Sequence, residues 1–310
     1  MVNTRAGTGQ QQEQVAGPFL KWAGGKSQLL KKFEGLFPED IKTGSVRNYV
    51  EPFVGGGAVY FFVNQRYRIG RCHIFDKNEE LVLAYSVVKK DVESLIREIT
   101  RISEEYVASD PAARQHMFYR IREDFNELHR DVDFSRYNRT WKERAAQLIF
   151  LNRTCYNGLF RVNSDGEFNV PFGRYRQPKI LDAEKLRAAS ATLANTSIHR
   201  GDFTACARYA PAGSFVYLDP PYRPRSRSSS FTSYASGGFR EGDQVRLARF
   251  ARTLDHKGVK FMISNSDTGD GFFEGIYDGF TLEKVLARRA INSKGAKRGE
   301  ITELIITNYR

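Results

Sequence analysis

The stretch Ser214-Phe215-Val216-Tyr217-Leu218-Asp219-Pro220-Pro221-Tyr222 decides the fold that we expect for this chain. Its first part is mostly apolar and rich in β-forming side chains, which predicts a buried strand. A carboxylate and two prolines follow at once, and a proline pair ends a strand and fixes the backbone direction. In an open α/β sheet, ligands bind at the carboxyl ends of the strands. A rigid carboxylate beside an aromatic ring suits a flat ring with an amino group, but a plain strand-ending turn explains these residues equally well.

The composition favours a globular protein with a polyanionic partner. The 310 residues carry a formal net charge of +12 and are 41% hydrophobic. A basic balance of this size favours nucleic acid, although a merely basic protein is an alternative. No apolar run reaches the roughly 18 residues of a membrane helix. Residues 1–17 are polar and lack an apolar signal core, so we expect a disordered tail.

Cysteine and histidine usage excludes several classes of protein. The three cysteines and five histidines are scattered, and no CxxC pair exists. A disulfide framework or a metal site is therefore not expected, and a reducing cytoplasm fits best. We interpret the three cysteines as structural.

Two further predicted strand ends carry polar or glycine-rich turns. Residues 48–62 read as a strand, three adjacent glycines and a helix, an arrangement that lets a cofactor lie against bare backbone. The next strand, 73–76, ends in Asp76, where a carboxylate can accept both ribose hydroxyls of an adenosine-containing cofactor. Asp202 follows a third short strand and can accept an adenine amino group. The alternatives are a tight turn without a ligand and carboxylates that only cap helices.

The order of these elements predicts an α/β fold with a Rossmann-like sheet that is mostly parallel. Late strands near 281–288 and 301–309 suggest an antiparallel edge. Helices between residues 78 and 153 interrupt the α/β alternation. We therefore predict a catalytic domain formed by residues 18–78 and 181–310, with residues 79–180 as an inserted target-recognition domain. A basic, serine-rich loop is expected from 223 to about 239.

A β-hairpin is predicted at the end of the inserted domain. Residues 159–163 and 167–172 alternate around the turn 164–166. A two-stranded ribbon fits the major groove of DNA, where arginine pairs with guanine and asparagine with adenine. Arg161 and Asn163 are the candidate readers, and residues 174–176 lie where they can hold phosphates. An ordinary surface hairpin is the alternative.

Together, the glycine turn, the ribose-type acid and the Asp-Pro-Pro-Tyr strand end describe an amino-methyltransferase that uses S-adenosyl-L-methionine (AdoMet). From Phe19 onward the chain also resembles the Dam-type, α-class DNA adenine N6-methyltransferases, which recognise GATC. The motifs that carry this resemblance are FLKWAGGK (19–26), VEPFVGGGAV (50–59), FD (75–76), LNRTCYNGLFRVN (151–163), GEFNVPFGRY (166–175), DPPY (219–222) and ISNSD (263–267).

The resemblance implies a role for each matching residue. For catalysis the residues are Asp219, Pro220 and Tyr222. For AdoMet they are Trp22, Lys26, Glu51, Phe53, Gly55, Gly57, Asp76, Asp202, Phe203 and Asp219. For DNA they are Lys21, Tyr156, Asn157, Leu159, Arg161, Asn163, Pro171 and Arg174. Arg161 would read guanine, Tyr156 and Asn157 would fill the gap left by a flipped base, and Lys21 would reach a flanking guanine.

The expected chemistry needs no covalent enzyme intermediate. The adenine N6 lone pair is delocalised, and hydrogen bonds from N6 to the Asp219 carboxylate and the Pro220 carbonyl would localise it. The amine cannot reach a cofactor inside a duplex, so the base must flip, and Tyr222 would stack on it. The expected partners are double-stranded DNA and a separately acting restriction endonuclease. We expect no membrane, and a monomer on DNA or a weak dimer. A catalytically silent DNA-binding module and an amino-methyltransferase acting on RNA or a protein amide are the alternatives.

Overall fold

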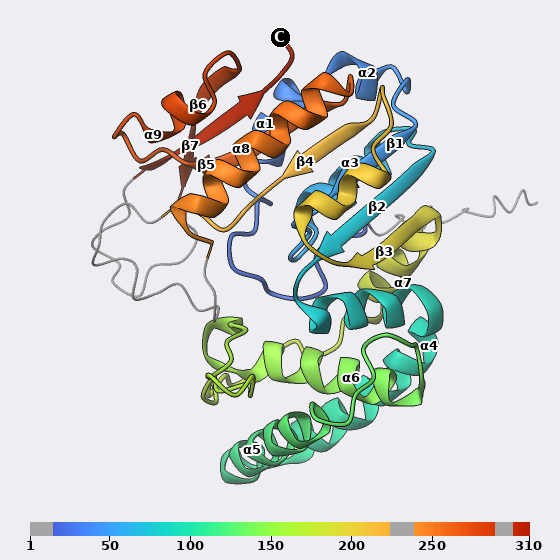
Figure 1. The fold of residues 1–310 in the computed structure, drawn as a ribbon. Helices are drawn as coiled ribbons and strands as arrows, with labels where there is room; N and C mark the ends of the chain where they lie inside the picture. Colours follow the sequence, from blue (N-terminus) through green and yellow to red (C-terminus); the bar gives the residue numbers. More distant parts are fainter. Residues whose placement is uncertain (1–14, 224–238, 289–299) are drawn as a thin grey trace, which may run out of the picture.

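The computed structural model describes residues 15–223, 239–288 and 300–310. These residues form a seven-stranded sheet in the order β3-β2-β1-β4-β5-β7-β6 (Figure 1). The strands are β1 Asn48–Glu51, β2 Arg71–Asp76, β3 Thr196–Arg200, β4 Phe215–Leu218, β5 Lys260–Ser266, β6 Thr281–Arg288 and β7 Glu300–Thr307. β7 pairs antiparallel with both β5 and β6, and the remaining neighbours pair parallel. The prediction of a mostly parallel α/β sheet with an antiparallel edge is confirmed.

The sheet has its switch point between β1 and β4. These two strands are neighbours, with Tyr49 opposite Phe215 and Val50 opposite Val216. From β1 the chain adds strands outward through β2 to β3, and from β4 it adds them outward in the other direction. A crevice opens at the carboxyl ends of two strands whose connections run in opposite directions, and ligands bind there in open α/β sheets.

Both faces of the sheet are covered, which explains why its central strands are almost wholly apolar. Successive residues alternate between two core clusters: Tyr217 belongs to the first, and Val216 and Leu218 to the second. Helix α8 covers the second face through Leu247 and Leu254. The helices outside the inserted segment are α1 Leu30–Leu36, α2 Glu39–Lys42, α3 Ala58–Arg66, α7 Ala183–Thr192, α8 Glu241–His256 and α9 Phe272–Ile276, with 3-10 turns Leu193–Asn195 (η2) and Phe203–Arg208 (η3).

Three helices follow β2 and belong to the predicted inserted segment: α4 Glu79–Ala108, α5 Pro111–Leu128 and α6 Arg139–Thr154. In Figure 1 they lie below the sheet, with α5 farthest from it. Asn78 caps α4 by accepting the backbone N–H groups of Glu80 and Leu81. α4 carries a non-helical residue, Asp91, at φ −151° and ψ 48°, where the helix kinks.

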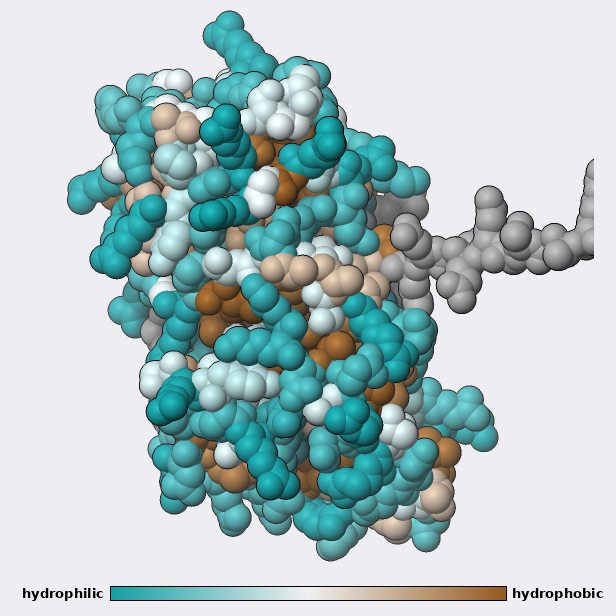
Figure 2. All heavy atoms as spheres, turned by 90° about the vertical axis from the view of Figure 1, so that its right-hand side faces the viewer, coloured by the Kyte–Doolittle hydropathy of each residue, from teal (hydrophilic) through white to brown (hydrophobic). Residues whose placement is uncertain are grey.

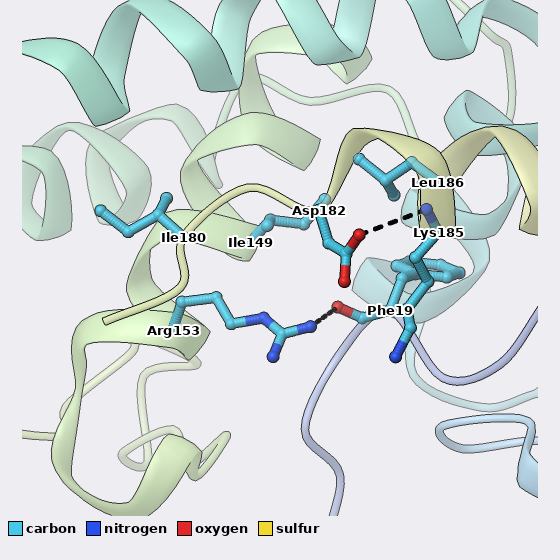
Figure 3. A pocket seen from close by; sticks show the side chains of 7 residues that line it. All are labelled: Phe19, Ile149, Arg153, Ile180, Asp182, Lys185 and Leu186. Atoms are coloured by element: carbon cyan, nitrogen blue, oxygen red, sulfur yellow. Dashed lines mark hydrogen bonds between the residues drawn. The ribbon is translucent and has the colours of Figure 1, made fainter. Parts of the chain in front are cut away.

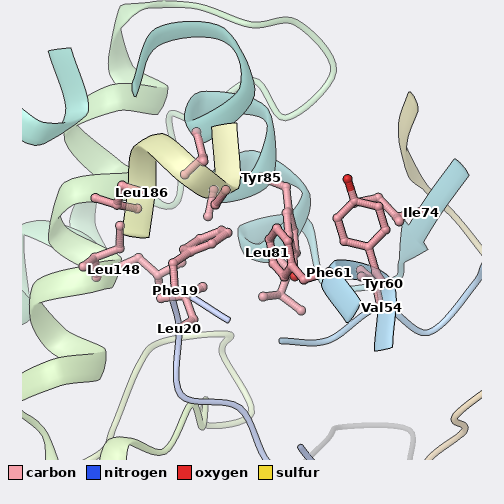
Figure 4. Packing of buried hydrophobic residues seen from close by; sticks show 14 of the residues in the cluster. Phe19, Leu20, Val54, Tyr60, Phe61, Ile74, Leu81, Tyr85, Leu148 and Leu186 are labelled. Carbon is pink, nitrogen blue, oxygen red and sulfur yellow. The ribbon is translucent and has the colours of Figure 1, made fainter. Parts of the chain in front are cut away.

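The helices α4, α5 and α6 share the first of the two core clusters with one face of the sheet. Arg144 of α6, only 1% exposed, forms an ion pair with Glu80 at the start of α4. Figure 4 shows the packing of the N-terminal segment against α3, α4, α6 and α7, with Phe19, Leu20, Phe61, Leu81, Tyr85, Leu148 and Leu186 labelled. The division into residues 18–78 with 181–310 and residues 79–180 stays a prediction.

The predicted hairpin returns on itself, but its two regular strands are wrong. Residues 155–175 contain only two isolated bridges, which pair Cys155 with Phe172 and Val162 with Phe168. Leu159 and Phe160 both pack against the core, so the expected alternation of faces is absent. Separate hydrogen bonds join the two arms instead of a continuous ladder: the Asn163 N–H donates to the Glu167 carbonyl, and the Asn169 N–H donates to the Arg161 carbonyl. The Asn126 side chain adds bonds to both the backbone N–H and the C=O of Phe168. Residues 156–158 form a 3-10 turn, η1.

The remaining expectations concern the surface and the ends of the chain. Residues 1–14 and 224–238, which hold most of the expected tail and loop, lie outside the described residues. Ala16 is buried, and its backbone pairs with the Gln65 side chain. The face on the β3 side is mostly hydrophilic, with apolar side chains between the polar ones (Figure 2). Among the described residues, no helix has both the length and the apolar character needed to cross a membrane. The three cysteines are free and buried.

Candidate active site

The carboxyl ends of the central strands carry a cluster of acidic side chains. Glu51 ends β1, Asp76 ends β2, and Asp219 follows β4 directly. Because these strands are neighbours and parallel, their ends meet at one edge of the sheet. This carboxyl edge, meaning the side of the sheet where the parallel strands end, contains the switch point between β1 and β4. The sequence predicted a ligand site at the carboxyl ends of these strands.

The glycine turn between β1 and α3 is locked by two side chains. Gly55 and Gly57 both have positive φ, 48° and 74°. The Asp76 Oδ2 atom accepts the Gly55 N–H at 3.0 Å, and the Tyr85 hydroxyl donates to the Gly55 carbonyl at 3.1 Å. A Cβ on Gly57 would lie 2.4 Å from the Tyr85 hydroxyl oxygen, so no larger residue fits without a shift. The backbone therefore remains bare at the N-terminus of α3.

Asp76 is held in place and keeps capacity for a ligand. Its Oδ1 atom accepts the Asn78 N–H at 2.9 Å, while Oδ2 accepts that of Gly55. Burial raises the pKa of the Asp76 carboxyl, and these backbone hydrogen bonds oppose the shift. Since each carboxylate oxygen has two lone pairs, both can accept a further hydrogen bond.

Asp219 lies in a network of hydrogen bonds at the end of β4. Lys26 Nζ donates to its Oδ2 at 2.7 Å, and Ser264 Oγ donates to its Oδ1 at 2.9 Å. The Tyr217 hydroxyl contacts the Ser264 hydroxyl at 2.9 Å. Lys26 is only 4% exposed, so its charge interacts with the carboxylate largely without water. The network fixes the orientation of both Asp219 oxygens.

Tyr222 completes this corner of the site. Its hydroxyl donates to Glu303 Oε2 of β7 at 2.6 Å. Lys26 Nζ lies 4.6 Å from the centre of its ring. The structure thus brings the first and last residues of the Asp-Pro-Pro-Tyr stretch together with Lys26, which is 193 residues away from Asp219 in sequence.

Glu51 adds a second buried carboxyl to the site. It is 2% exposed and accepts a hydrogen bond from the Tyr49 hydroxyl. Burial raises the pKa of the Glu51 carboxyl; the bond from Tyr49 opposes the shift, Asp219 adds to it, and Lys26 opposes it. The acidic groups around the Lys26 ammonium suit a cationic ligand.

Asp202 and Phe203 lie at the end of β3 with an aromatic neighbour. Asp202 accepts the Thr204 N–H and is bonded by Arg246, so the alternative of a capping role is observed. Burial alone would raise the pKa of Asp202, but Arg246 and the Thr204 N–H lower it overall. The Phe53 ring stacks on Phe203 at 5.5 Å between centroids. A role of these three residues in cofactor binding stays a prediction.

The N-terminal segment 19–22 connects the cofactor side of the site to the predicted recognition segment. The Asn152 side chain accepts the Lys21 N–H and donates to the carbonyls of Lys21 and Gly158. The Trp22 ring stacks on Phe160 at 5.2 Å between centroids. Arg153, which follows Asn152 in the chain, donates to the Phe19 carbonyl at 2.7 Å. This hydrogen bond lies beside a cavity of about 10 Å³ (Figure 3). Such a volume holds no more than one water molecule.

The predicted DNA-binding residues differ in how they are held. Arg161 donates from Nε to Asn169 Oδ1 at 2.6 Å and from Nη2 to the Asn169 carbonyl. The Asn163 side chain accepts the N–H groups of residues 165 and 167, so it also forms the turn that it precedes. Tyr156 is 49% exposed. The other predicted contacts are Lys21, Asn157, Leu159, Pro171 and Arg174, of which Leu159 is partly buried and packs on the core.

Two residues of this segment adopt left-handed backbone that is unusual outside glycine. Asn157 has φ 56° and Arg174 has φ 53°. The Asn157 N–H donates to the Tyr175 hydroxyl at 2.9 Å. Residues held in sparsely populated backbone regions cluster at functional sites, which supports a role for both.

Sequence reasoning missed Glu303 and did not separate Asn152 and Ser264 from the motifs that contain them. Glu303 interrupts the apolar run Ile301–Ile306, and a single carboxylate in such a strand is a signal that was available. The bonds of Asn152 to Lys21 join residues 131 apart, so no local pattern indicates them. Among the described residues, no group of three His, Cys, Asp or Glu side chains forms a metal-binding cluster.

The chain is similar in sequence to proteins of one family. Residues 22–291 match the family model described as D12 class N6 adenine-specific DNA methyltransferase. The chain is 50% identical over 293 residues to the Type II methyltransferase M.MjaIII of Methanocaldococcus jannaschii, covering 94% of this chain and 99% of the relative. It is 40% identical to the Type II methyltransferase M1.LlaDCHI of Lactococcus lactis subsp. cremoris, covering 94% and 95%. It is 33% identical to the DNA adenine methylase of Escherichia coli, covering 93% of each chain.

Proposed function

Because the chain belongs to the D12 class of N6 adenine-specific DNA methyltransferases, we propose that it methylates adenine N6 in GATC of double-stranded DNA, with AdoMet as donor. The observation that carries the proposal is the Asp219 network at the switch point. There a strand-end carboxylate, a buried ammonium and an aromatic ring meet beside a bare glycine turn.

The residues at this edge suit AdoMet. Bare backbone at Gly55 and Gly57 leaves room for close approach, and Asp76 has lone pairs for ribose hydroxyls. Trp22 lies against Gly55, where its ring can line the same crevice. When bound, the cofactor supplies an electrophilic methyl group on a positively charged sulfonium. The Asp219 carboxylate favours a cation at this place.

Asp219 and Pro220 would activate the amine. The adenine N6 lone pair is delocalised into the ring, so the free amine is a poor nucleophile. Ser264 and Lys26 orient the Asp219 carboxylate, which can accept one N6–H while the Pro220 carbonyl accepts the other. Two acceptors arranged in this way favour a tetrahedral nitrogen with a localised lone pair.

Base flipping would deliver the adenine to this corner. An adenine inside a duplex cannot reach a buried carboxylate, and extruding it costs a few kcal/mol. Tyr222 would stack on the extruded ring. Asn157 and Tyr156, exposed in the 3-10 turn η1 near the start of the recognition segment 155–175, would fill the gap in the duplex.

The choice of GATC rests on the resemblance of residues 155–175 to the segment that reads this sequence in Dam-type enzymes. Arg161 is held by Asn169, which supports the pre-oriented guanidinium that a bidentate guanine contact requires. A separately acting endonuclease, a monomer or weak dimer on DNA, and the cytoplasm stay predictions.

Transfer of a labelled methyl group from AdoMet to matched duplexes tests the proposal. One duplex carries GATC, one carries the same bases in another order, and one is an RNA duplex of the same sequence. We expect label in N6-methyladenine of the GATC duplex alone. Equal labelling of both DNA duplexes would contradict the site, and tight binding without labelling would indicate a silent DNA-binding module.

A further inference from the structure

Glu303 occupies an unusual position for a carboxylate. It lies in the middle of β7, between β5 and β6, where it pairs with Ser266 on one side and Val285 on the other. Its neighbours in the strand, Leu304 and Ile305, are each 1% exposed. An apolar residue would be expected here, since a charged group in a central strand loses hydration.

The carboxylate points toward the proposed adenine pocket. Strand alternation puts Glu303 on the same face as Ile305, which belongs to the core cluster that contains Tyr217. On that face its Oε2 atom accepts the Tyr222 hydroxyl at 2.6 Å. The partner is the last residue of the Asp-Pro-Pro-Tyr stretch.

This contact holds the far end of the Tyr222 ring. The near end is restrained by Pro221, whose ring fixes the preceding backbone, and whose carbonyl accepts a hydrogen bond from Gln244. A tyrosine anchored only at its Cα can rotate about χ1, whereas one that is anchored at both ends cannot. The two anchors therefore fix the long axis of the ring before any base arrives, and Lys26 Nζ, 4.6 Å from the ring centre, restricts rotation of the ring about that axis.

Charge in the pocket favours the same arrangement. Burial raises the pKa of the Tyr222 phenol, and the carboxylates of Asp219 and Glu303 add to the shift, so the hydroxyl keeps its proton and remains a donor. Burial also raises the pKa of the Glu303 carboxyl, although Lys26 and the Tyr222 hydroxyl oppose it. Lys26, located 4.6 Å from the ring centre, forms an ion pair with Asp219 at 2.7 Å.

We propose that Glu303 is a positioning residue that holds the Tyr222 ring as the stacking plate for the flipped adenine. The proposal rests on the proposed function, in which Tyr222 stacks on that base. Glu303 itself would touch neither the cofactor nor the base, and it would act through the orientation of one ring.

The test compares Glu303→Ala, Glu303→Gln and Tyr222→Phe with the double variant Glu303→Ala/Tyr222→Phe. Steady-state kcat and KM are measured on a GATC duplex. Fluorescence of 2-aminopurine at the target position reports how the flipped base stacks. Affinities for AdoMet and for DNA, together with the thermal midpoint, are measured in parallel. Glu283→Ala, an exposed carboxylate on the adjacent strand β6, is the matched control.

We expect Glu303→Ala to lower kcat by about 10-fold to 100-fold, the effect of losing one hydrogen bond to a charged group. The 2-aminopurine signal should rise, since a loosely held ring quenches it less, while AdoMet and DNA affinities stay within about 3-fold. Glu303→Gln keeps an acceptor oxygen and should retain most activity. The double variant should be no slower than Tyr222→Phe, because both changes remove the same bond.

Several results would overturn the role. Losses that multiply in the double variant would show that Glu303 acts independently of the tyrosine hydroxyl. A kcat of Glu303→Ala equal to that of Glu283→Ala would show that the contact is irrelevant, and a loss confined to AdoMet affinity would make Glu303 a cofactor residue. Absence of transfer by the unchanged protein would instead refute the proposed function, which the same assay detects separately.

Discussion

The carboxyl edge of the sheet and residues 155–175 are proposed to serve one reaction, but different interactions build them. At the sheet edge, Glu51, Asp76 and Asp219 stand where they do because parallel strands end together. In residues 155–175, only two isolated bridges and a few backbone hydrogen bonds join the two arms, and bonds from distant side chains add to them. Asn126 and Asn152, both outside the segment, provide several of these bonds.

The two regions therefore differ in how the positions of their residues are fixed. A strand end inherits its position from backbone pairing over several residues, so one substitution there changes chemistry and leaves the frame intact. A segment that is held by separate hydrogen bonds, several of them from distant side chains, depends on each of those bonds for its shape. Substitutions at the sheet edge should therefore split activity from folding, whereas substitutions in or beside the segment should move binding, stability and specificity together.

Asp219→Ala gives the largest expected effect and tests the first half of this comparison. Loss of the carboxylate removes the acceptor for the N6–H, and kcat should fall by roughly a thousand-fold or more. The β4 backbone pairs do not involve the side chain, so DNA affinity and the thermal midpoint should change little. Single-turnover transfer and equilibrium DNA binding measure the two quantities. Near-normal turnover would show that Asp219 is not the activating group.

The sheet edge was also the part that could be predicted. Apolar runs that end in Asp76 and Asp219 predict buried strands. Ligands bind at the carboxyl ends of such strands in open α/β sheets, so the site follows once the strands are known. Glu303 was missed because its role depends on β7 entering antiparallel between β5 and β6. That order is a property of pairing between residues far apart in sequence.

Gly57→Ala should show how tightly the sheet edge is packed. A Cβ at φ 74° and 2.4 Å from the Tyr85 hydroxyl should cost about 3 kcal/mol of unfolding free energy. Urea unfolding measures it. Gly35→Ala in α1, where nothing lies within 4 Å of the added Cβ, is the control and should be neutral or stabilising by up to about 1 kcal/mol. Adding Tyr85→Phe should restore part of the loss, and no restoration would place the strain in the backbone alone.

Asn152→Ala tests the second half of the comparison. The change leaves the Lys21 N–H and C=O and the Gly158 C=O without this partner, which should cost about 2–4 kcal/mol. Since these groups join the segment of Trp22 to the recognition turn, affinities for AdoMet and DNA should both weaken. Asn152→Asp keeps the acceptor but turns a buried carboxylate oxygen toward the Lys21 and Gly158 carbonyls, so its loss should be at least as large. Weakening of only one ligand would mean that the two regions are not connected through this residue.

The recognition segment was predicted less well for the same physical reason. The turn at residues 164–166 follows from local chemistry, since Asn163 accepts the N–H groups of residues 165 and 167. The left-handed backbone of Asn157 depends instead on Tyr175, which is 18 residues away. The regular strands failed because Leu159, expected on the face opposite to Phe160, also packs against the core, while Phe160 stacks on Trp22. A pattern of period two cannot anticipate a partner from the other end of the chain.

Arg161→Ala should give the smallest effect on stability and the sharpest one on specificity. A bidentate guanine contact discriminates against the wrong base by about 1–3 kcal/mol, so the ratio of kcat/KM between GATC and a duplex altered at its guanine should fall by roughly 10-fold to 100-fold. The slope of binding against salt should barely change, because no phosphate contact is lost. Asn169→Ala, which removes the acceptor for Arg161 Nε, should partly relax the choice of base at the same position.

Arg176→Ala is the control. Loss of this exposed arginine in the expected phosphate-holding stretch should weaken binding to all sequences alike and reduce the salt slope by about 1. If Arg161→Ala behaves like Arg176→Ala, then Arg161 holds the DNA backbone, and sequence choice lies in another part of the segment.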